Sequence, residues 1–241
     1  MPRTLIWKTI ADHLTREIAE RHYAPGDKLP TEAALATRFG VNRHTVRRAL
    51  ADLSAHSLVV ARRGSGVFVA QTPTDYPIGR RVRFHKNLTA AGRVPTKSFQ
   101  VLEQRKSNPR EAEALGLKPE TKVLVCEGLS FADDQPIALF RSVFPAPRFS
   151  GLLDDLAQTQ SVTAALARHG VDDYTRTSTR LTAKQATATQ ALHLRIAEGA
   201  PILRSVGINV DEHNLPVELG HTWFVGDRVT LTLDETSGHS K

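Results

Sequence analysis

Residues 39–50 read FGVNRHTVRRAL, and this stretch decides the fold of the first third of the chain. Gly40 is a natural end for one helix, and Asn42 is a natural N-cap for the next. Val46 and Leu50 then recur at helical spacing, which predicts a helix with one buried stripe. Two helices joined by so short a turn are typical of a helix-turn-helix.

The flanking sequence completes a small domain. Residues 4–22 show the apolar spacing of an amphipathic helix, and Thr31 is a suitable N-cap for the helix that follows it. Residues 58–60 and 67–69 are short β-prone runs on either side of RRGSG, so they predict a hairpin with a basic tip. The order of these elements predicts a winged helix-turn-helix, mainly α, over residues 1–70.

A second domain is expected after a linker. Residues 71–77, QTPTDYP, contain two prolines and no apolar periodicity, so they predict a semi-rigid linker. Beyond them hairpin patterns dominate, for example on either side of Asp133 and Asp134, with a helix expected over residues 184–192. We therefore expect residues 78–236 to form an α+β domain, an antiparallel sheet with helices on one side.

The net charge of the 241 residues is +7, and its distribution is uneven. Residues 1–70 hold 11 Lys and Arg against 6 Asp and Glu, whereas residues 71–241 hold 21 against 19. A basic excess in one module is typical of a nucleic-acid-binding domain.

Cys126 is the only cysteine, which excludes an internal disulfide, and no apolar run is long enough for a membrane span. We expect a cytoplasmic protein.

The third helix of the first domain carries the side chains best suited to reading DNA. On a helical wheel His44, Arg47 and Arg48 lie opposite Val46, and Arg43 lies at the first turn. An arginine fork can bond O6 and N7 of guanine in the major groove, which indicates base readout by this face. The alternative is that these arginines form only a solvated helix face.

Three stretches resemble the winged helix of the GntR family of bacterial regulators: YAPGDKLPTE at residues 23–32, the stretch at residues 39–50, and RRGSGVFV at residues 62–69. The resemblance implies that the arginines matching Arg43 and Arg47 read bases and that the wing enters the minor groove. The DNA contacts expected from pattern and resemblance together are Thr31, Glu32, Asn42, Arg43, His44, Thr45, Arg47, Arg48, Arg62, Arg63 and Gly64.

The second domain resembles the effector domain of the HutC-type branch of this family, the UTRA domain, which has a chorismate-lyase-like fold. The matching motifs include LGL at residues 115–117, APIL at residues 200–203, LPVE at residues 215–218 and GDR at residues 226–228. Narrower motifs are similar to regulators of phosphonate utilisation: NRHT at residues 42–45, DYP at residues 75–77, RF at residues 83–84 and NL at residues 87–88.

That narrower resemblance implies a repressor of phosphonate uptake and metabolism genes, controlled by a small phosphonate or phosphate-bearing anion. We expect a homodimer, paired mainly through the second domains, on a palindromic operator. A sugar phosphate or a carboxylate is the alternative effector. Relatives that bind sugar phosphates carry Arg-x-Arg where this chain has Gly128, Leu129 and Ser130, which argues against a sugar phosphate.

Several side chains of the second domain suit an anion. Arg141 lies in an otherwise apolar strand pattern, and a charge there needs a partner or a ligand. Arg176 and Arg180 are four residues apart in a strand pattern, so we expect them to share one face. The resemblance adds a hydroxyl and a carboxylate, and the full set of effector candidates is Arg83, Phe84, His85, Asn87, Arg141, Ser161, Arg176 and Glu218.

Less specific interpretations of these residues stay open. Arg141 can pair across strands with Glu127 or Glu218, Arg176 and Arg180 can form a solvated strand face, and His85 can be a surface histidine.

An enzyme is the main rival class of function, because the resemblance implies a fold shared with a lyase. The sequence has no His-Glu-x-x-His motif, no phosphate-binding glycine loop and no nucleophile elbow, so we expect neither catalysis nor a metal or cofactor. An architectural DNA-binding protein without a sensor is the second rival.

Overall fold

The computed structural model describes residues 5–62 and 64–233. The chain divides into two compact units, Met1–Thr72 and Pro73–Lys241, and each is described by itself. No helix in the described part of the chain is long and apolar enough to cross a membrane.

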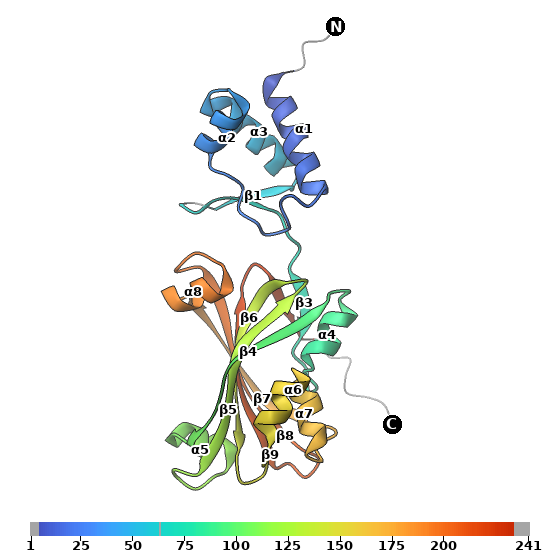
Figure 1. The fold of residues 1–241 in the computed structure, drawn as a ribbon, viewed down its shortest axis with the longest axis vertical. Helices are drawn as coiled ribbons and strands as arrows, with labels where there is room; N and C mark the ends of the chain where they lie inside the picture. Colours follow the sequence, from blue (N-terminus) through green and yellow to red (C-terminus); the bar gives the residue numbers. More distant parts are fainter. Residues whose placement is uncertain (1–4, 63, 234–241) are drawn as a thin grey trace. The chain divides into compact units, whose positions relative to one another are not determined.

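Helices and a hairpin follow one another in the first unit in the expected order. Gly40 ends the second helix with a left-handed φ of 64°, and the side chain of Asn42 caps the third by accepting from the backbone N–H of Thr45 at 2.8 Å. The winged helix-turn-helix is thereby confirmed. Its elements are α1 (Ile6–Ala19), α2 (Glu32–Phe39), α3 (Arg43–Ala55), β1 (Val59–Arg62) and β2 (Gly66–Val69) (Figure 1).

One apolar stripe from each helix forms the core of the first unit. Leu14 of α1, Leu35 of α2 and Val46 of α3 are fully buried and belong to one cluster. Burying a side chain of this size contributes about 1.5–3 kcal/mol. Val59 and Val69 pair across the hairpin and close the cluster, so the wing is packed against the helices that it follows.

The second unit contains a six-stranded antiparallel sheet with strand order β4-β5-β6-β9-β8-β7. A shorter parallel pair, β3 and β10, stands beside it. This arrangement confirms the expected α+β class. The elements are β3 (Thr74–Pro77), α4 (Phe84–Ala90), β4 (Pro95–Lys106), α5 (Pro109–Leu115), β5 (Lys122–Ala132), β6 (Gln135–Pro145), α6 (Leu152–Thr159), α7 (Val162–Arg168), β7 (Thr175–Gln185), α8 (Ala188–Leu194), β8 (Pro201–Val210), β9 (Pro216–Val225) and β10 (Val229–Thr232).

Helices cover both faces of the large sheet, so the expectation that they lie on one side is wrong. On the first face, Cys126 and Phe140 pack with α6 and α7. On the second face, Val143 packs with α5 and Leu129 packs with α8, at opposite ends of the sheet (Figure 1). The physical reason is that β5 and β6 are apolar on both faces and therefore need cover on both.

Two expected boundaries are also wrong. The linker was expected to run to residue 77, but Thr74–Pro77 forms a strand that pairs with β10. Alternate residues of this strand are buried, and one of them, Tyr76, is only 4% exposed and packs against Phe224. The helix expected from residue 184 begins later. β7 continues through Gln185, and a capping box at Thr187 starts α8.

Candidate functional sites

An exposed basic surface on α3 contains the principal candidates for DNA contact. Arg43, His44 and Arg47 are all solvent-exposed there. Arg47 makes two hydrogen bonds to Glu32 of α2, from Nη2 to Oε2 at 2.8 Å and from Nε to Oε1 at 3.2 Å. The hydrogen bond from Arg47 lowers the pKa of Glu32, although desolvation opposes it, and the charges of Arg43 and His44 lower it further. The structure therefore brings these four predicted residues together.

Other predicted DNA contacts take part in helix capping. The Thr31 hydroxyl accepts from the N–H of Ala34, and Asn42 Oδ1 accepts from both the N–H and the hydroxyl of Thr45, at 2.8 and 2.9 Å. Capping fixes where α2 and α3 begin. These side chains consequently position the basic surface, and their exposed atoms stay available to phosphate groups.

Arg48 differs from its neighbours. Its guanidinium lies over the ring of Trp7 in α1, 4.7 Å from the ring centroid. A cation over an aromatic face stabilises this contact by roughly 0.5–1 kcal/mol at an exposed site. Arg48 therefore ties α3 to α1, which the helical wheel did not indicate.

The tip of the wing has the backbone that a tight turn needs. Gly64 has a φ of 74°, which glycine adopts readily, and apart from its chain neighbours no described atom lies within 4 Å of the position that a Cβ would take. Arg62 pairs with Gly66 at the end of the hairpin. The side chain of Arg62 and the whole of Arg63 lie outside the described residues.

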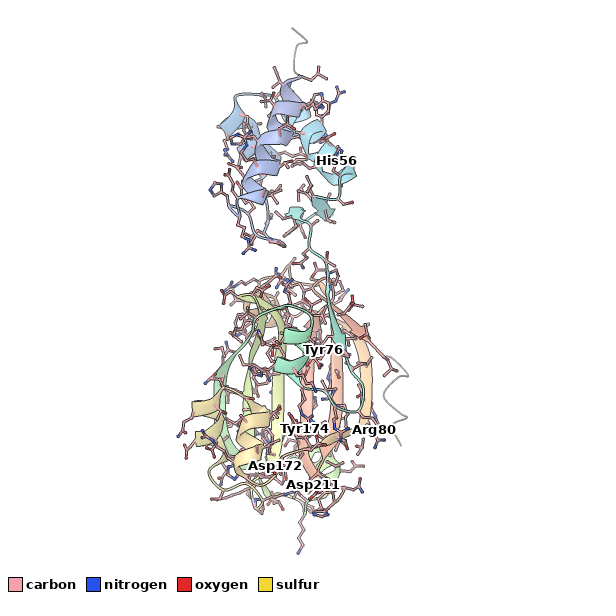
Figure 2. All side chains as sticks on the ribbon, turned by 90° about the vertical axis from the view of Figure 1, so that its right-hand side faces the viewer. His56, Tyr76, Arg80, Asp172, Tyr174 and Asp211 are labelled. Carbon is pink, nitrogen blue, oxygen red and sulfur yellow. The ribbon has the colours of Figure 1, made fainter. Side chains whose placement is uncertain are left out.

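A pocket of about 80 Å³ lies on the first face of the large sheet. This volume exceeds the ~10–15 Å³ that one water requires. Aromatic side chains form much of its wall, among them Tyr76 and Tyr174, which Figure 2 labels. Five of the eight predicted effector residues line it, namely Phe84, His85, Ser161, Arg176 and Glu218.

Three charged side chains reach this pocket from different strands. Lys97 of β4 places its ammonium 4.1 Å from the ring centroid of Phe140. Arg176 of β7 donates from Nε to Oδ1 of Asn209 at 3.2 Å. Glu218 of β9 is 7% exposed. It accepts a hydrogen bond from Asn209 Nδ2 at 2.6 Å and another from the hydroxyl of Ser142 at 2.5 Å. Burial lowers the pKa of Lys97, whereas Cys126 and Glu218 raise it.

His85 also lines the pocket and is not a free surface histidine. Burial lowers its pKa, and the nearby charge of Lys97 lowers it further, so the neutral ring is favoured near pH 7. The hydroxyl of Ser161 caps α7 by accepting from the N–H of Ala164 at 3.3 Å. Within the described residues, no group of His, Cys, Asp or Glu side chains is arranged to hold a metal ion.

Arg83 and Asn87 were also predicted to bind the effector, but they hold the protein framework instead. Arg83 donates to Oδ1 of Asp173 at 2.8 Å and to the carbonyl of Tyr174 at 2.7 Å, and its guanidinium lies over the Tyr174 ring. Asn87 is buried and donates to the carbonyl of Pro77 at 3.0 Å. Neither residue lines the pocket.

Arg141 does not belong to this pocket, which corrects the prediction made for it. It lies on the second face of the sheet and donates from Nε to Oε1 of Glu127 on the neighbouring strand at 2.6 Å. The cross-strand pair is thus the partner that an arginine in an apolar strand needs. Arg141 instead lines a groove on the second face together with Arg180, Arg204 and His221.

Sequence reasoning missed several residues of the pocket. Lys97 and Asn209 line the pocket, and neither is among the effector candidates that the sequence predicts. The available signal was alternation: in β8, the polar residues Ser205 and Asn209 are four residues apart and line the same pocket. Buried polar side chains in such a strand indicate a site.

The fold and the basic α3 surface define the class of this protein: it is a DNA-binding transcription regulator with a separate pocket-bearing unit. The family of bacterial regulatory proteins named gntR matches residues 7–69, and the UTRA domain matches residues 90–230. The chain belongs to the GntR family, and its second unit contains a UTRA domain.

The chain is similar to known regulators over nearly its whole length. It is 37% identical to the uncharacterized HTH-type transcriptional regulator RB1450 of Rhizobium meliloti (strain 1021), over 95% of this chain and 94% of that protein. It is 31% identical to the probable transcriptional regulator PhnF of Escherichia coli (strain K12), over the same shares. The crystal structure of PhnF from Mycobacterium smegmatis matches with a TM-score of 0.64 and 25% identity, over 96% of this chain and all of that one.

Proposed function

We propose that this protein represses genes of phosphonate uptake or metabolism and leaves its operator when a small phosphonate or phosphate-bearing anion binds the second unit. The observation that carries the proposal is the pocket of the second unit, where neither Lys97 nor Arg176 forms an ion pair among the described residues. Lys97 lies over aromatic rings, and Arg176 donates to the amide oxygen of Asn209. Arginine binds a phosphate-type group through paired hydrogen bonds, and lysine binds it as a point charge. The similarity to two proteins named PhnF supports the same effector class.

The DNA-bound form that we propose is a homodimer, paired through the second units and acting in the cytoplasm. Its two α3 helices would lie in successive major grooves of a palindromic operator, with half-site centres ~10 bp or a small multiple of it apart. Arg43 and Arg47 would read guanines, while the exposed ends of α2 and α3 bind phosphates. Effector binding would change operator affinity through a coupling free energy of about 1–3 kcal/mol.

The test uses the full chain and a labelled duplex that spans the region upstream of its own gene. Fluorescence anisotropy at fixed salt gives operator affinity against an excess of random-sequence competitor. We expect specific binding, a footprint with two-fold symmetry, and release by methylphosphonate or inorganic phosphate. Glucose 6-phosphate and citrate serve as the sugar-phosphate and carboxylate comparisons. Release by one of these alone would contradict the phosphonate assignment, and diffuse footprinting would contradict the operator.

A further inference from the structure

Three charged side chains line the pocket on the first face, and among the described residues none of them forms a direct ion pair with an opposite charge. Lys97 lies near the rings of Phe140 and Phe84, at 4.1 and 5.1 Å from their centroids. Arg176 donates to an amide oxygen, and Glu218 accepts from one amide and one hydroxyl. Among the described residues, no ion pair joins any of the three to an opposite charge.

Glu218 acts on Lys97 through space, but among the described residues neither side chain is in a direct ion pair. Buried charges without such direct contacts are costly, so this pocket is best completed by a ligand that supplies them. Lys97 and Arg176 require an anion. Glu218 requires a cation or a strong donor, and an anion alone would face its carboxylate with a like charge. A carboxylate has about four acceptor positions, and two of those on Glu218 are in use.

Asn209 keeps the opposite charges at fixed places. Its Oδ1 accepts from Arg176 at 3.2 Å, while its Nδ2 donates to Glu218 Oε2 at 2.6 Å. The strand beneath is shaped for this arrangement, since a Cβ at Gly207 would lie 2.7 Å from Arg176 Nε. The amide and the glycine together hold the guanidinium beside the carboxylate without a direct ion pair.

We infer that the ligand of this pocket is a small zwitterion, with an anionic phosphonate-type group bound by Lys97 and Arg176 and an ammonium group bound by Glu218. The inference rests on the proposed role of the pocket as the effector site and narrows its ligand from anions in general to amino-bearing ones.

Calorimetry on the full chain tests the inference with three probes, of which the two phosphonates are matched in size. We expect 2-aminoethylphosphonate to bind at least about tenfold more tightly than propylphosphonate, as expected for one added charged hydrogen bond. Propylamine, which lacks the anion, should not bind measurably. Equal affinity for the two phosphonates would overturn the zwitterion while leaving the anion site standing. Failure of both phosphonates to bind would overturn this inference and the proposed effector class together.

Two variants assign the charges. Glu218→Gln should reduce the preference for the amino ligand to within about twofold, because the carboxylate charge is gone. Lys97→Met should weaken both phosphonates by a similar factor and keep the preference. Arg180→Met, on the second face, is the matched control and should behave as the unmodified protein. A full preference in a folded Glu218→Gln protein would refute the assignment, and the three-probe comparison holds even if that variant does not fold.

Discussion

Arg176 and Arg180 lie four residues apart in β7, yet they line cavities on opposite faces of the sheet. The cause is a β-bulge. Arg176 pairs with Asn209 and Ser178 pairs with Ile208, so Thr177 is the extra residue between them. One inserted residue reverses the alternation of side chains beyond it. The bulge thus sends Arg176 into the small pocket and Arg180 into the groove on the second face.

This pair provides the first prediction. Arg176→Ala should raise the phosphonate concentration needed for half-release from the operator by about tenfold or more, because a charged hydrogen-bond donor is lost from the pocket. Arg180→Ala removes the same charge from the same strand and should change half-release by less than about twofold. Anisotropy titrations of the two variants measure the difference. Equal effects of the two substitutions on half-release would show that phosphonate binding depends on the net charge of β7 and not on which face of the sheet each arginine occupies.

The second prediction concerns Arg141, which its strand pattern suggested as an effector contact. Its partner is Glu127, and both side chains are partly exposed, at 42% and 33%. Arg141→Ala should therefore leave phosphonate affinity unchanged and lower the free energy of unfolding by no more than about 1 kcal/mol. Calorimetry and urea denaturation measure the two quantities. Loss of effector binding in a stably folded Arg141→Ala protein would show that Arg141 does contribute to the effector site.

Local signals in the sequence were sufficient for the first unit. Gly40 and Asn42 mark helix ends through backbone chemistry that acts within a few residues, and the structure has both ends where they were expected. The hairpin expected on either side of Asp133 and Asp134 is also present, as the pair of β5 and β6. These features depend on neighbours in the chain, which the sequence displays directly.

The errors have a different origin. The bulge at Thr177 depends on which strand lies beside which, and no local pattern states that. The ion pair of Arg141 with Glu127 was foreseen as the alternative to an effector contact, and the structure bears out that alternative. Tyr76 was assigned to a linker because residues 71–77 contain two prolines. The strand that this segment forms pairs with β10, which lies far along the chain. Lys97 was missed because its surroundings, the ring of Phe140 and the carboxylate of Glu218, come from other strands and are not visible in the local sequence.

The third prediction tests base readout by Arg47, whose guanidinium is held by Glu32 in the free protein. Arg47→Ala should cost roughly 1–3 kcal/mol of operator binding and relax base preference. Arg47→Lys keeps the charge but loses the planar fork, so it should retain nonspecific affinity and lose specificity. Competition titrations with single-base operator variants measure this. Unchanged specificity in both proteins would remove Arg47 from base readout.

The fourth prediction is a pH dependence at Glu111, which is buried at the start of α5. Hydrogen bonds from Arg105 lower its pKa below 4.5, against desolvation, and a backbone hydrogen bond at Asn108 lowers it further. A lowered folded-state pKa adds stability above the unfolded value, and that stability is lost as the pH falls through the folded value. The stability advantage over Glu111→Gln should therefore be constant near pH 7 and shrink below pH 4.5. Urea denaturation at a series of pH values measures it, and a pH-independent difference would contradict the linkage.

The last prediction concerns Arg228, which is 6% exposed and joins separate parts of the second unit. Its Nη1 donates to the carbonyls of Pro136 at 2.6 Å and Leu194 at 2.7 Å, and its Nη2 donates to that of Arg195 at 3.0 Å. Two of these carbonyls belong to the end of α8, where helix carbonyls lack partners within the helix. Arg228→Ala would leave three carbonyls without these donors and open a cavity beside them.

We expect this substitution to lower the free energy of unfolding by roughly 2–4 kcal/mol, since each unsatisfied buried group is costly. Arg110→Ala, at an exposed position of α5, is the control and should change it by less than about 0.5 kcal/mol. Urea denaturation followed by circular dichroism measures both. Amide exchange in α8 separates this mechanism from a general loss of stability: it should accelerate in Arg228→Ala under native conditions before exchange in the central strands does. Uniform acceleration would mean that Arg228 supports the whole sheet and not the end of α8.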